Sequence, residues 1–217
     1  MRLVVFGYDF PHWKTVNGLL ALRSAGYDLF AVLAPPKKLN IPCSDYRVSP
    51  IEYNLNPKDV CIALGVDYIV KPHDEYDLSF ELGIVLGARI LPKKVINRFP
   101  KGIINIHPGI LPGNRGLDNL KHSIIKGLPI GNTAHLIDHR IDMGIILKTQ
   151  ITEIKPDDTI RDVFIRQRSE QIKLLLEVLQ SDLTGVPCET SEKFTAITKE
   201  EDDNLHLYWE EYKCGLV

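Results

Sequence analysis

The feature that most constrains the fold of this chain is a repeated alternation of two kinds of segment. Short apolar runs of strand length alternate with longer segments that place apolar side chains at helical spacing. Strands that are apolar throughout are typical of a parallel sheet with both faces covered by helices. The alternation therefore predicts an α/β fold with a mostly parallel central sheet flanked by helices. The expected strands include residues 2–8, 27–35, 82–86 and 102–109, and the expected helices include 12–27, 57–66, 117–127 and 159–185.

The 217 residues are enough for one domain with a small appendage. We expect a core at residues 1–185 and a C-terminal extension at residues 186–217 that packs on the core or on a partner subunit. The extension mixes charged residues with an aromatic group formed by Tyr208, Trp209 and Tyr212. Aromatic side chains in such a segment either cover the core or form an interface, so a homodimer is one expectation.

Composition narrows the class of partner. The formal net charge is −2 and there is no basic run, so we expect no nucleic-acid partner. The apolar stretches are too short and too interrupted to cross a bilayer, so no membrane partner is expected. The four cysteines are scattered without a C-x-x-C pair, and the first residues do not resemble a secretion signal. These features favour a reducing, cytoplasmic location.

Two polar residues interrupt the apolar strand at residues 102–109. Asn105 and His107 are two positions apart, so on a strand their side chains leave the same face. Ligands of parallel α/β sheets gather beyond the carboxyl ends of the strands, where this pair lies. Asp142, in a loop between two expected strands, is a candidate to orient the imidazole. An amide, an imidazole and a carboxylate suit acyl transfer to an amine, although a strand histidine is more often structural.

A metal hydrolase is the first alternative, because His135, Asp138, His139 and Asp142 are close in sequence. The apolar alternation at residues 133–137 favours a strand over a helix. Four residues of strand would separate the two histidines by about 13 Å, which is too far for one ion. We therefore expect no metal site.

The segment "NIHPGILPGNRG", followed by "GNTAHLIDHRIDMGIILKTQ", resembles the signature of the folate-dependent formyltransferases. In that family an N-x-H-P motif leads into an L-L-P-x-x-R-G loop, followed by T-x-H and D-x-G. The resemblance is strongest over about residues 76–152. It implies a Rossmann-like formyltransferase core, 10-formyltetrahydrofolate as co-substrate, and Asn105, His107 and Asp142 as catalytic residues.

The same resemblance assigns further residues. Arg89, Ile90 and Leu91 match the stretch whose backbone binds the pteridine ring, and His135 matches a supporting histidine. The loop that closes over the ring is matched by Asp138, His139, Arg140 and Ile141.

Members of the family differ mainly in the acceptor amine. The purine-pathway enzyme, phosphoribosylglycinamide formyltransferase, holds a phosphate on a Gly-rich loop after its first strand, whereas this chain has "FGYDFPHWKT". The initiator-tRNA enzyme and the formyl-folate hydrolases carry additional domains that we do not expect here. The remaining group formylates nucleotide-linked amino sugars, as in polysaccharide biosynthesis. Tyr8, Asp9, Phe10, Asn114 and Arg115 are then candidate acceptor contacts.

The expected function is therefore N-formyl transfer to a nucleotide-linked amino sugar. The purine-pathway activity remains an alternative. A non-catalytic folate- or sugar-binding protein is a third possibility, from a different class. On the catalytic hypothesis, activity falls at acid pH, where the acceptor amine and Asp142 take up protons.

Overall fold

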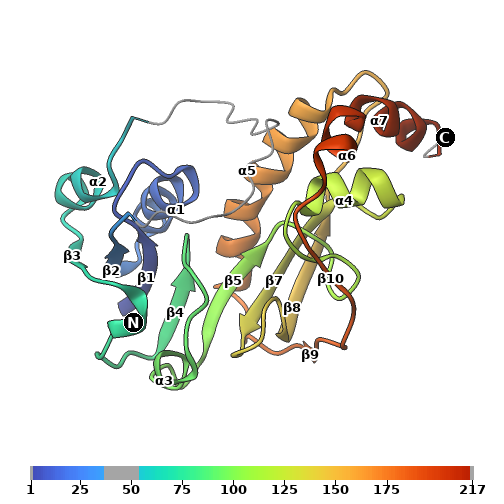
Figure 1. Ribbon diagram of the computed structural model, residues 1–217. Helices are drawn as coiled ribbons and strands as arrows, with labels where there is room; N and C mark the ends of the chain where they lie inside the picture. Colours follow the sequence, from blue (N-terminus) through green and yellow to red (C-terminus); the bar gives the residue numbers. More distant parts are fainter. Residues whose placement is uncertain (1, 37–53, 216–217) are drawn as a thin grey trace. The chain divides into compact units, whose positions relative to one another are not determined.

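The computed structural model describes residues 2–36 and 54–215. The described residues form two compact units. Unit 1 holds residues 2–36, 54–105 and 136–141, and unit 2 holds residues 106–135 and 142–215. Figure 1 labels the elements of both units. The predicted boundary between residues 185 and 186 does not coincide with this division, and it stays a prediction.

Unit 1 is built on a parallel sheet. Its strands lie in the order β3-β2-β1-β4-β5, and each neighbouring pair in this series is parallel. The elements are β1 (Arg2–Tyr8), α1 (Trp13–Ser24), β2 (Asp28–Ala34), α2 (Pro57–Leu64), β3 (Asp67–Val70), the 3-10 helix η1 (His73–Glu75), β4 (Leu82–Val85), α3 (Lys93–Ile96) and β5 (Ile103–His107). The prediction of a mostly parallel α/β sheet is confirmed.

The apolar strands of unit 1 are buried, as their composition predicts. Phe6 on β1 is fully buried and makes edge-to-face contacts with Tyr76 and Phe99. Helix α1 packs closely on the sheet at Gly18, where an added Cβ would lie 2.3 Å from the side chain of Leu86. Its first turn is capped by His12, whose Nδ1 accepts the backbone N–H of Thr15 at 3.3 Å. The loop between β1 and α1 is thus fixed at both ends.

Unit 2 contains most of the remaining elements. They are β6 (Arg115–Gly116), α4 (Asn119–Lys126), β7 (Gly131–Ile137), β8 (Gly144–Ile151), α5 (Ile160–Val178), β9 (Val186–Pro187), β10 (Lys193–Phe194), α6 (Lys199–Asp203) and α7 (Leu205–Cys214). The last two residues of β7 belong to unit 1, and the last two of β5 to unit 2. The expected N-cap Thr159 forms a full capping box with Asp162. Gly127 ends α4 in the left-handed conformation.

The C-terminal segment packs on its own unit. Trp209 on α7 is 4% exposed and belongs to an apolar cluster with Ile124, Ile130, Val163 and Leu205. Its indole N–H donates to the carbonyl of Asp158 at 3.2 Å. A buried ion pair of 2.5 Å between Lys121 and Asp202 also joins α4 to α6. Trp209 is therefore a core residue of unit 2.

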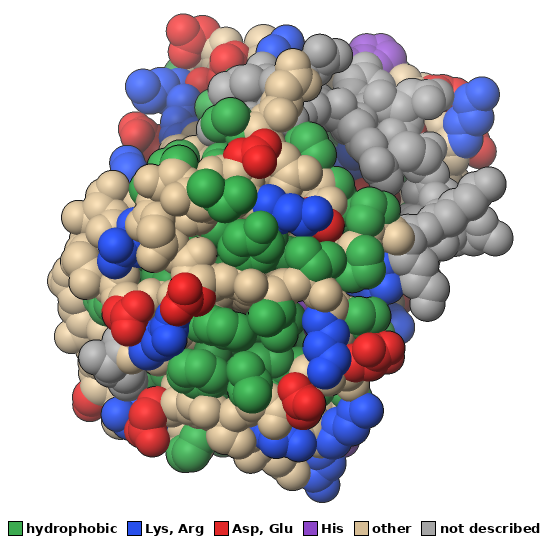
Figure 2. All heavy atoms as spheres, turned by 90° about the vertical axis from the view of Figure 1, so that its left-hand side faces the viewer, with side chains coloured by type: hydrophobic (Ala, Val, Ile, Leu, Met, Phe, Trp, Pro, Cys, Tyr) green, Lys and Arg blue, Asp and Glu red, His purple; other side chains and the backbone are tan. Residues whose placement is uncertain are grey.

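No helix among residues 2–36 and 54–215 combines the length and apolarity that a membrane span needs. Figure 2 shows one face of the molecule, on which Lys and Arg side chains alternate with Asp and Glu around apolar areas. Charge of one sign does not form a continuous field there.

Candidate functional site

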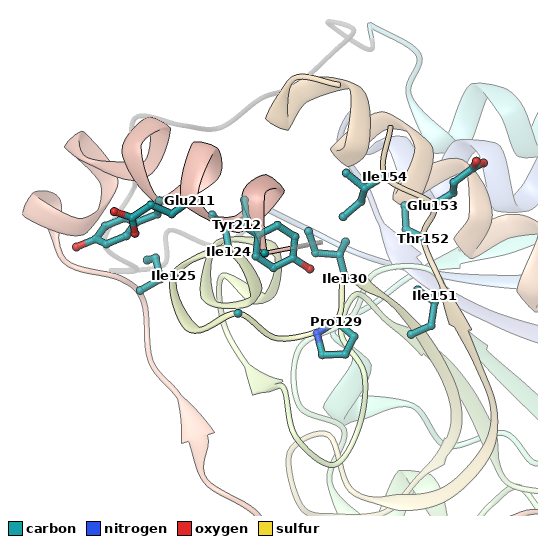
Figure 3. Close-up of a pocket in the computed structure, with 13 residues that line it drawn as sticks. Ile124, Ile125, Pro129, Ile130, Ile151, Thr152, Glu153, Ile154, Glu211 and Tyr212 are labelled. Atoms are coloured by element: carbon teal, nitrogen blue, oxygen red, sulfur yellow. The ribbon is translucent and has the colours of Figure 1, made fainter. Parts of the chain in front are cut away.

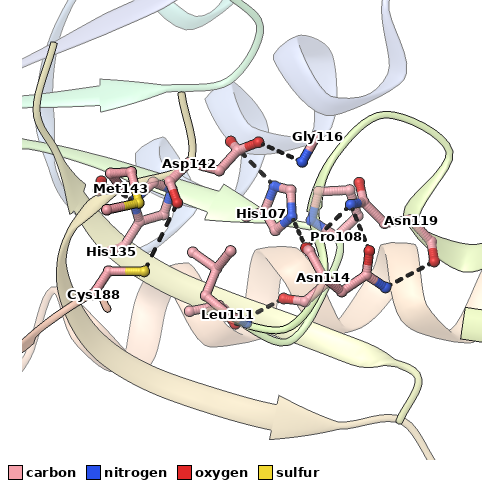
Figure 4. A network of polar contacts seen from close by, with 12 residues as sticks. His107, Pro108, Leu111, Asn114, Gly116, Asn119, His135, Asp142, Met143 and Cys188 are labelled. Atoms are coloured by element: carbon pink, nitrogen blue, oxygen red, sulfur yellow. Dashed lines mark hydrogen bonds and ion pairs between the residues drawn. The ribbon is translucent and has the colours of Figure 1, made fainter. Parts of the chain in front are cut away.

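His107, the last residue of β5, is 3% exposed and has an oxygen against each ring nitrogen (Figure 4). Its Nδ1 lies 3.3 Å from Oδ1 of Asp142, and its Nε2 lies 2.8 Å from the carbonyl oxygen of Asn114. A carboxylate and a carbonyl only accept hydrogen bonds, so the doubly protonated ring alone donates to both. Both ring nitrogens of His107 are thus held by oxygen atoms of the protein.

Asp142 is held at both of its carboxylate oxygens. One oxygen faces His107, and the other accepts the backbone N–H of Gly116 at 2.9 Å. The backbone of Asp142 has a φ of 49°, an unusual left-handed conformation that aspartate tolerates better than most residues. Burial opposes ionisation, but the hydrogen bonds from His107 and Gly116 and the nearby charge of His135 outweigh it and lower the pKa of Asp142. The carboxylate of Asp142 is thus held between the ring of His107 and the backbone of Gly116.

The loop after β5 is braced from within. The side chain of Asn114 is 1% exposed, and its amide donates to the carbonyl of Asn119 at 2.9 Å and to Oγ of Ser123 at 2.8 Å. Thr133 on β7 accepts the N–H of Leu111 at 3.0 Å and donates to the carbonyl of Gly109 at 2.7 Å. These bonds satisfy buried polar groups that would otherwise lack a partner. These hydrogen bonds hold the Asn114 side chain inside the protein, and its predicted contact with an acceptor stays a prediction.

His135 lies beside the pair on β7 and is 1% exposed. Its Nδ1 lies 3.0 Å from the carbonyl of Met143, so Nδ1 carries a proton and donates. Its ring stands edge-on to that of His107, with centroids 6.4 Å apart. This geometry fits the supporting role that the resemblance implies. Among the residues that the structure describes, no group of three or more His, Cys, Asp or Glu side chains is arranged to hold a metal ion.

Asn105 lies on β5 two residues before His107 and is half-buried, with Val85 as its neighbour on β4. Because successive strand residues alternate faces, its side chain leaves the same side of β5 as that of His107. It belongs to unit 1, whereas His107 and Asp142 belong to unit 2.

The segments predicted to hold the pteridine ring lie in unit 1. Leu91 is buried in an apolar cluster, and Ala88 and Ile137 pack against the same cluster. Segment 88–92 thus packs on this cluster through Ala88 and Leu91, and segment 138–141 follows Ile137, which packs on the same cluster. Ile90 is 68% exposed. In the second segment Asp138 is paired with Arg140, whose Nε donates to it at 2.9 Å.

The loop after β1 carries the other predicted acceptor contacts. Tyr8 and Phe10 are stacked, with ring centroids 4.7 Å apart, and His12 stands edge-on to Tyr8 at 5.0 Å. Burial raises the pKa of Tyr8, partly opposed by the charge of Arg89. Asp9 forms an ion pair of 2.9 Å with Lys58 on α2. Sequence reasoning missed both His12 and Lys58, because neither lies in the family motif.

Arg115 has a structural contact that the sequence does not reveal. Its side chain is buried, and Nη1 donates to the carbonyl of Ser191 at 2.8 Å. Sequence reasoning also missed the amide of Gly116 and the contacts of residues 188–197. Only the Arg-Gly pair within "PGNRG" signalled a special backbone at residue 116.

A groove of about 640 Å³ on unit 2 lies apart from these residues (Figure 3). It is lined mainly by isoleucines from α4, β8 and the residues that follow them, with Tyr208 and Tyr212 from α7. None of the predicted site residues lines it.

Comparisons with known proteins show what the chain is similar to. Residues 78–179 match the family model described as formyl transferase. This stretch is a formyl transferase domain. This formyltransferase domain thus contains Asn105, His107 and Asp142 within the matched residues.

A methionyl-tRNA formyltransferase from Heliobacterium modesticaldum is 31% identical over 195 residues, which are 85% of this chain and 58% of the relative. The chain therefore spans less than three fifths of the length of that relative. An N-formyltransferase from Helicobacter canadensis, solved with folinic acid and dTDP-3-aminofucose, superimposes with a TM-score of 0.65 at 18% identity, covering 97% of this chain and 81% of that one. A glycinamide ribonucleotide transformylase from Symbiobacterium toebii gives 0.62 at 17% identity, covering 87% and 94%. These two structures share the fold of this chain.

Proposed function

We propose that this protein transfers a formyl group from 10-formyltetrahydrofolate to the amine of a nucleotide-linked amino sugar. The observation that carries the proposal is the buried pair of His107 and Asp142 at the end of β5, with Nδ1 and Oδ1 3.3 Å apart. A charged pair of this kind costs desolvation, and functional sites are where such costs are commonly met. The matched family gives the pair its chemistry.

The reaction needs charge stabilisation and one proton transfer. The acceptor amine attacks the formyl carbon, the bond from that carbon to the folate nitrogen breaks, and one proton passes from the amine to that nitrogen. In the proposal Asn105 donates its amide N–H to the formyl oxygen as negative charge develops there. The ring of His107 stabilises the same charge, and Asp142 keeps the ring oriented. Asp142 also accepts the amine proton, directly or through water.

The folate is proposed to bind on unit 1. The exposed Ile90 and the buried Leu91 present a short stretch of backbone with an apolar surface, which suits the face and edge of a flat ring. The segment from Asp138 to Ile141 packs near the same core and would close over the ring. The solved relative from Helicobacter canadensis was crystallised with folinic acid, which supports a folate as the donor.

The acceptor is argued from the loop after β1. A phosphate-binding loop at this place would need small residues and free backbone N–H groups. This chain instead has the stacked rings of Tyr8 and Phe10, and Asp9 in an ion pair with Lys58. Aromatic faces suit a sugar or a base better than a phosphate. Phosphoribosylglycinamide formylation is the second candidate, supported by the shared fold of the Symbiobacterium enzyme.

The test is turnover with 10-formyltetrahydrofolate against a panel of nucleotide-linked amino sugars, with glycinamide ribonucleotide as a competing acceptor. Formylation of one sugar, and none of the ribonucleotide, is the expected result. Activity on the ribonucleotide alone would replace the proposal by the purine-pathway function. Tight folate binding without turnover on any acceptor would favour a binding protein.

A further inference from the structure

The contacts of Asp142 lead to the C-terminal segment of the chain. The carboxylate depends on the N–H of Gly116, which lies on β6. Strand β6 has one partner, β10, with Arg115 opposite Lys193 and Gly116 opposite Phe194. We name residues 188–197 the strap. All of these residues belong to unit 2.

The strap holds the loop after β5 along its length. Nη1 of Arg115 donates to the carbonyl of Ser191 at 2.8 Å, and the hydroxyl of Ser191 donates to the carbonyl of Pro112. The N–H of Leu117 donates to the carbonyl of Phe194 at 3.1 Å. The loop residues that face His107 and Asp142 are thus tied to the strap on both sides of Asn114.

The strap also reaches the loop that carries Asp142. The N–H of Cys188 donates to the carbonyl of Gly144 at 2.8 Å, and Sγ of Cys188 lies 3.9 Å from the carbonyl of Asp142. One short segment therefore contacts the chain on both sides of the His107–Asp142 pair.

Close approach of the two backbones leaves no room for a side chain at residue 116. Gly116 has a φ of 103°, and an added Cβ would lie 2.1 Å from the carbonyl oxygen of Phe194. The glycine therefore permits the strap to pack against β6 while the N–H of Gly116 donates to Asp142.

We propose that the strap is part of the reactive site, and that Arg115 and Ser191 act as positioning residues that fix the Gly116 N–H on the carboxylate of Asp142. Neither side chain contacts the reacting atoms in this scheme. The kinetic part of the proposal rests on the proposed function, whereas the geometric part does not.

The test uses Ser191→Ala, which removes the hydroxyl contact with Pro112 and keeps the carbonyl that binds Arg115. Ser181→Ala is the matched control, because the hydroxyl of Ser181 likewise donates to a backbone carbonyl, that of Val178 at 2.8 Å, at the end of α5. Ser191→Thr restores a hydroxyl. Arg115→Lys is the second variant, and circular dichroism shows that each variant is folded.

Two readouts need no activity. In Ser191→Ala and Arg115→Lys the amide of Gly116 should exchange with solvent about tenfold faster. The Asp142 carboxyl, followed by carbon NMR, should titrate at higher pH because its hydrogen bond from the Gly116 N–H is weakened. The other groups that face it, His107 and His135, are intact in both variants. Ser181→Ala should change neither readout, and Ser191→Thr should restore both.

The third readout is turnover. The kcat should fall about tenfold with KM unchanged. Unchanged exchange and titration in both folded variants would overturn the proposal, and so would equal effects in Ser181→Ala. If the wild-type protein shows no turnover on any acceptor, the proposed function fails, while exchange and titration still decide the positioning role.

Discussion

His107 and Asn114 are joined through the Nε2 atom of the ring and the backbone carbonyl of the asparagine, 2.8 Å apart. Asp142 lies against the other ring nitrogen, so both nitrogens of the ring have a partner. The buried side chain of Asn114 is hydrogen-bonded to the carbonyl of Asn119 and to Oγ of Ser123 on α4, which fixes the position of its residue. The orientation of the His107 ring therefore depends on the contacts between the loop after β5 and α4.

Replacing the ring tests its role in turnover. We expect His107→Asn to lower kcat by about 10²–10⁴-fold, because the substitution removes the imidazole that is proposed to stabilise the developing negative charge. Folate affinity, measured by calorimetry, should stay near the wild-type value, since the segments predicted to bind folate lie in unit 1. His206→Asn is the matched control, because His206 is an exposed histidine on α7. Equal kcat in the two variants would contradict a role in turnover.

The lowered pKa of Asp142 predicts how stability depends on pH. Its contribution to stability is fully present above its ordinary value of 3.8 and is lost as pH falls through the lower pKa of the folded state. Asp142→Asn removes this dependence. The difference in unfolding free energy between wild type and variant, from urea melts, should be constant above about pH 5 and should shrink below pH 4. A difference that stays constant into strong acid would mean that the carboxyl has an ordinary pKa.

The same shift refines the expected pH profile of turnover. Asp142 stays ionised well below neutral pH, so its protonation does not limit activity between about pH 5 and 8. The acid limb in that range should follow the pKa of the acceptor amine and should move when an acceptor of different basicity is used. A limb fixed at one pH for all acceptors would point to a group on the protein.

Thr133 offers a test of how firmly the loop is held. Thr133→Val leaves the N–H of Leu111 and the carbonyl of Gly109 buried without their partner, which should cost about 2–4 kcal/mol of unfolding free energy. Thr133→Ser keeps the hydroxyl and should recover most of this loss. Equal unfolding free energies of the two variants, measured in urea melts, would show that the Thr133 hydroxyl does not stabilise the loop.

Two glycines with left-handed backbones separate strain from close contact. Gly127→Ala meets no atom within 4 Å and should cost only about 1 kcal/mol for its φ of 65°. Gly116→Ala places a Cβ 2.1 Å from the carbonyl oxygen of Phe194, so it should cost clearly more and should separate β6 from β10. Thermal melts of both variants measure the difference. Similar decreases in melting temperature for the two variants would mean that the strap moves away from residue 116 at little cost in stability.

The sequence predicts the elements of unit 1 well, because mainly apolar runs such as residues 2–8 and 102–109 are recognised from composition. The N-cap at Thr159 and the end of α4 at Gly127 are likewise local signals. The resemblance to formyltransferases provides His107 and Asp142, which the structure places in contact.

The sequence does not predict what surrounds them. The partner of Gly116 is a backbone carbonyl at residue 194, and backbone contacts between distant segments carry no residue signature. Strands β6 and β10 are two residues long, which is too short for any periodicity. The position of Asn114 next to the strand of His107 predicts either an acceptor contact or a bracing role, and the sequence does not show that its side chain is buried.

The approach of Phe194 to Gly116 has a consequence for chimaeric enzymes. A designer who wishes to exchange acceptor preference between relatives would naturally transplant residues 108–118 as a cassette. The transplanted residues would keep their conformation only in a recipient whose residues equivalent to 188–197 have the same backbone position. The two segments should therefore be exchanged together, although they are far apart in the sequence.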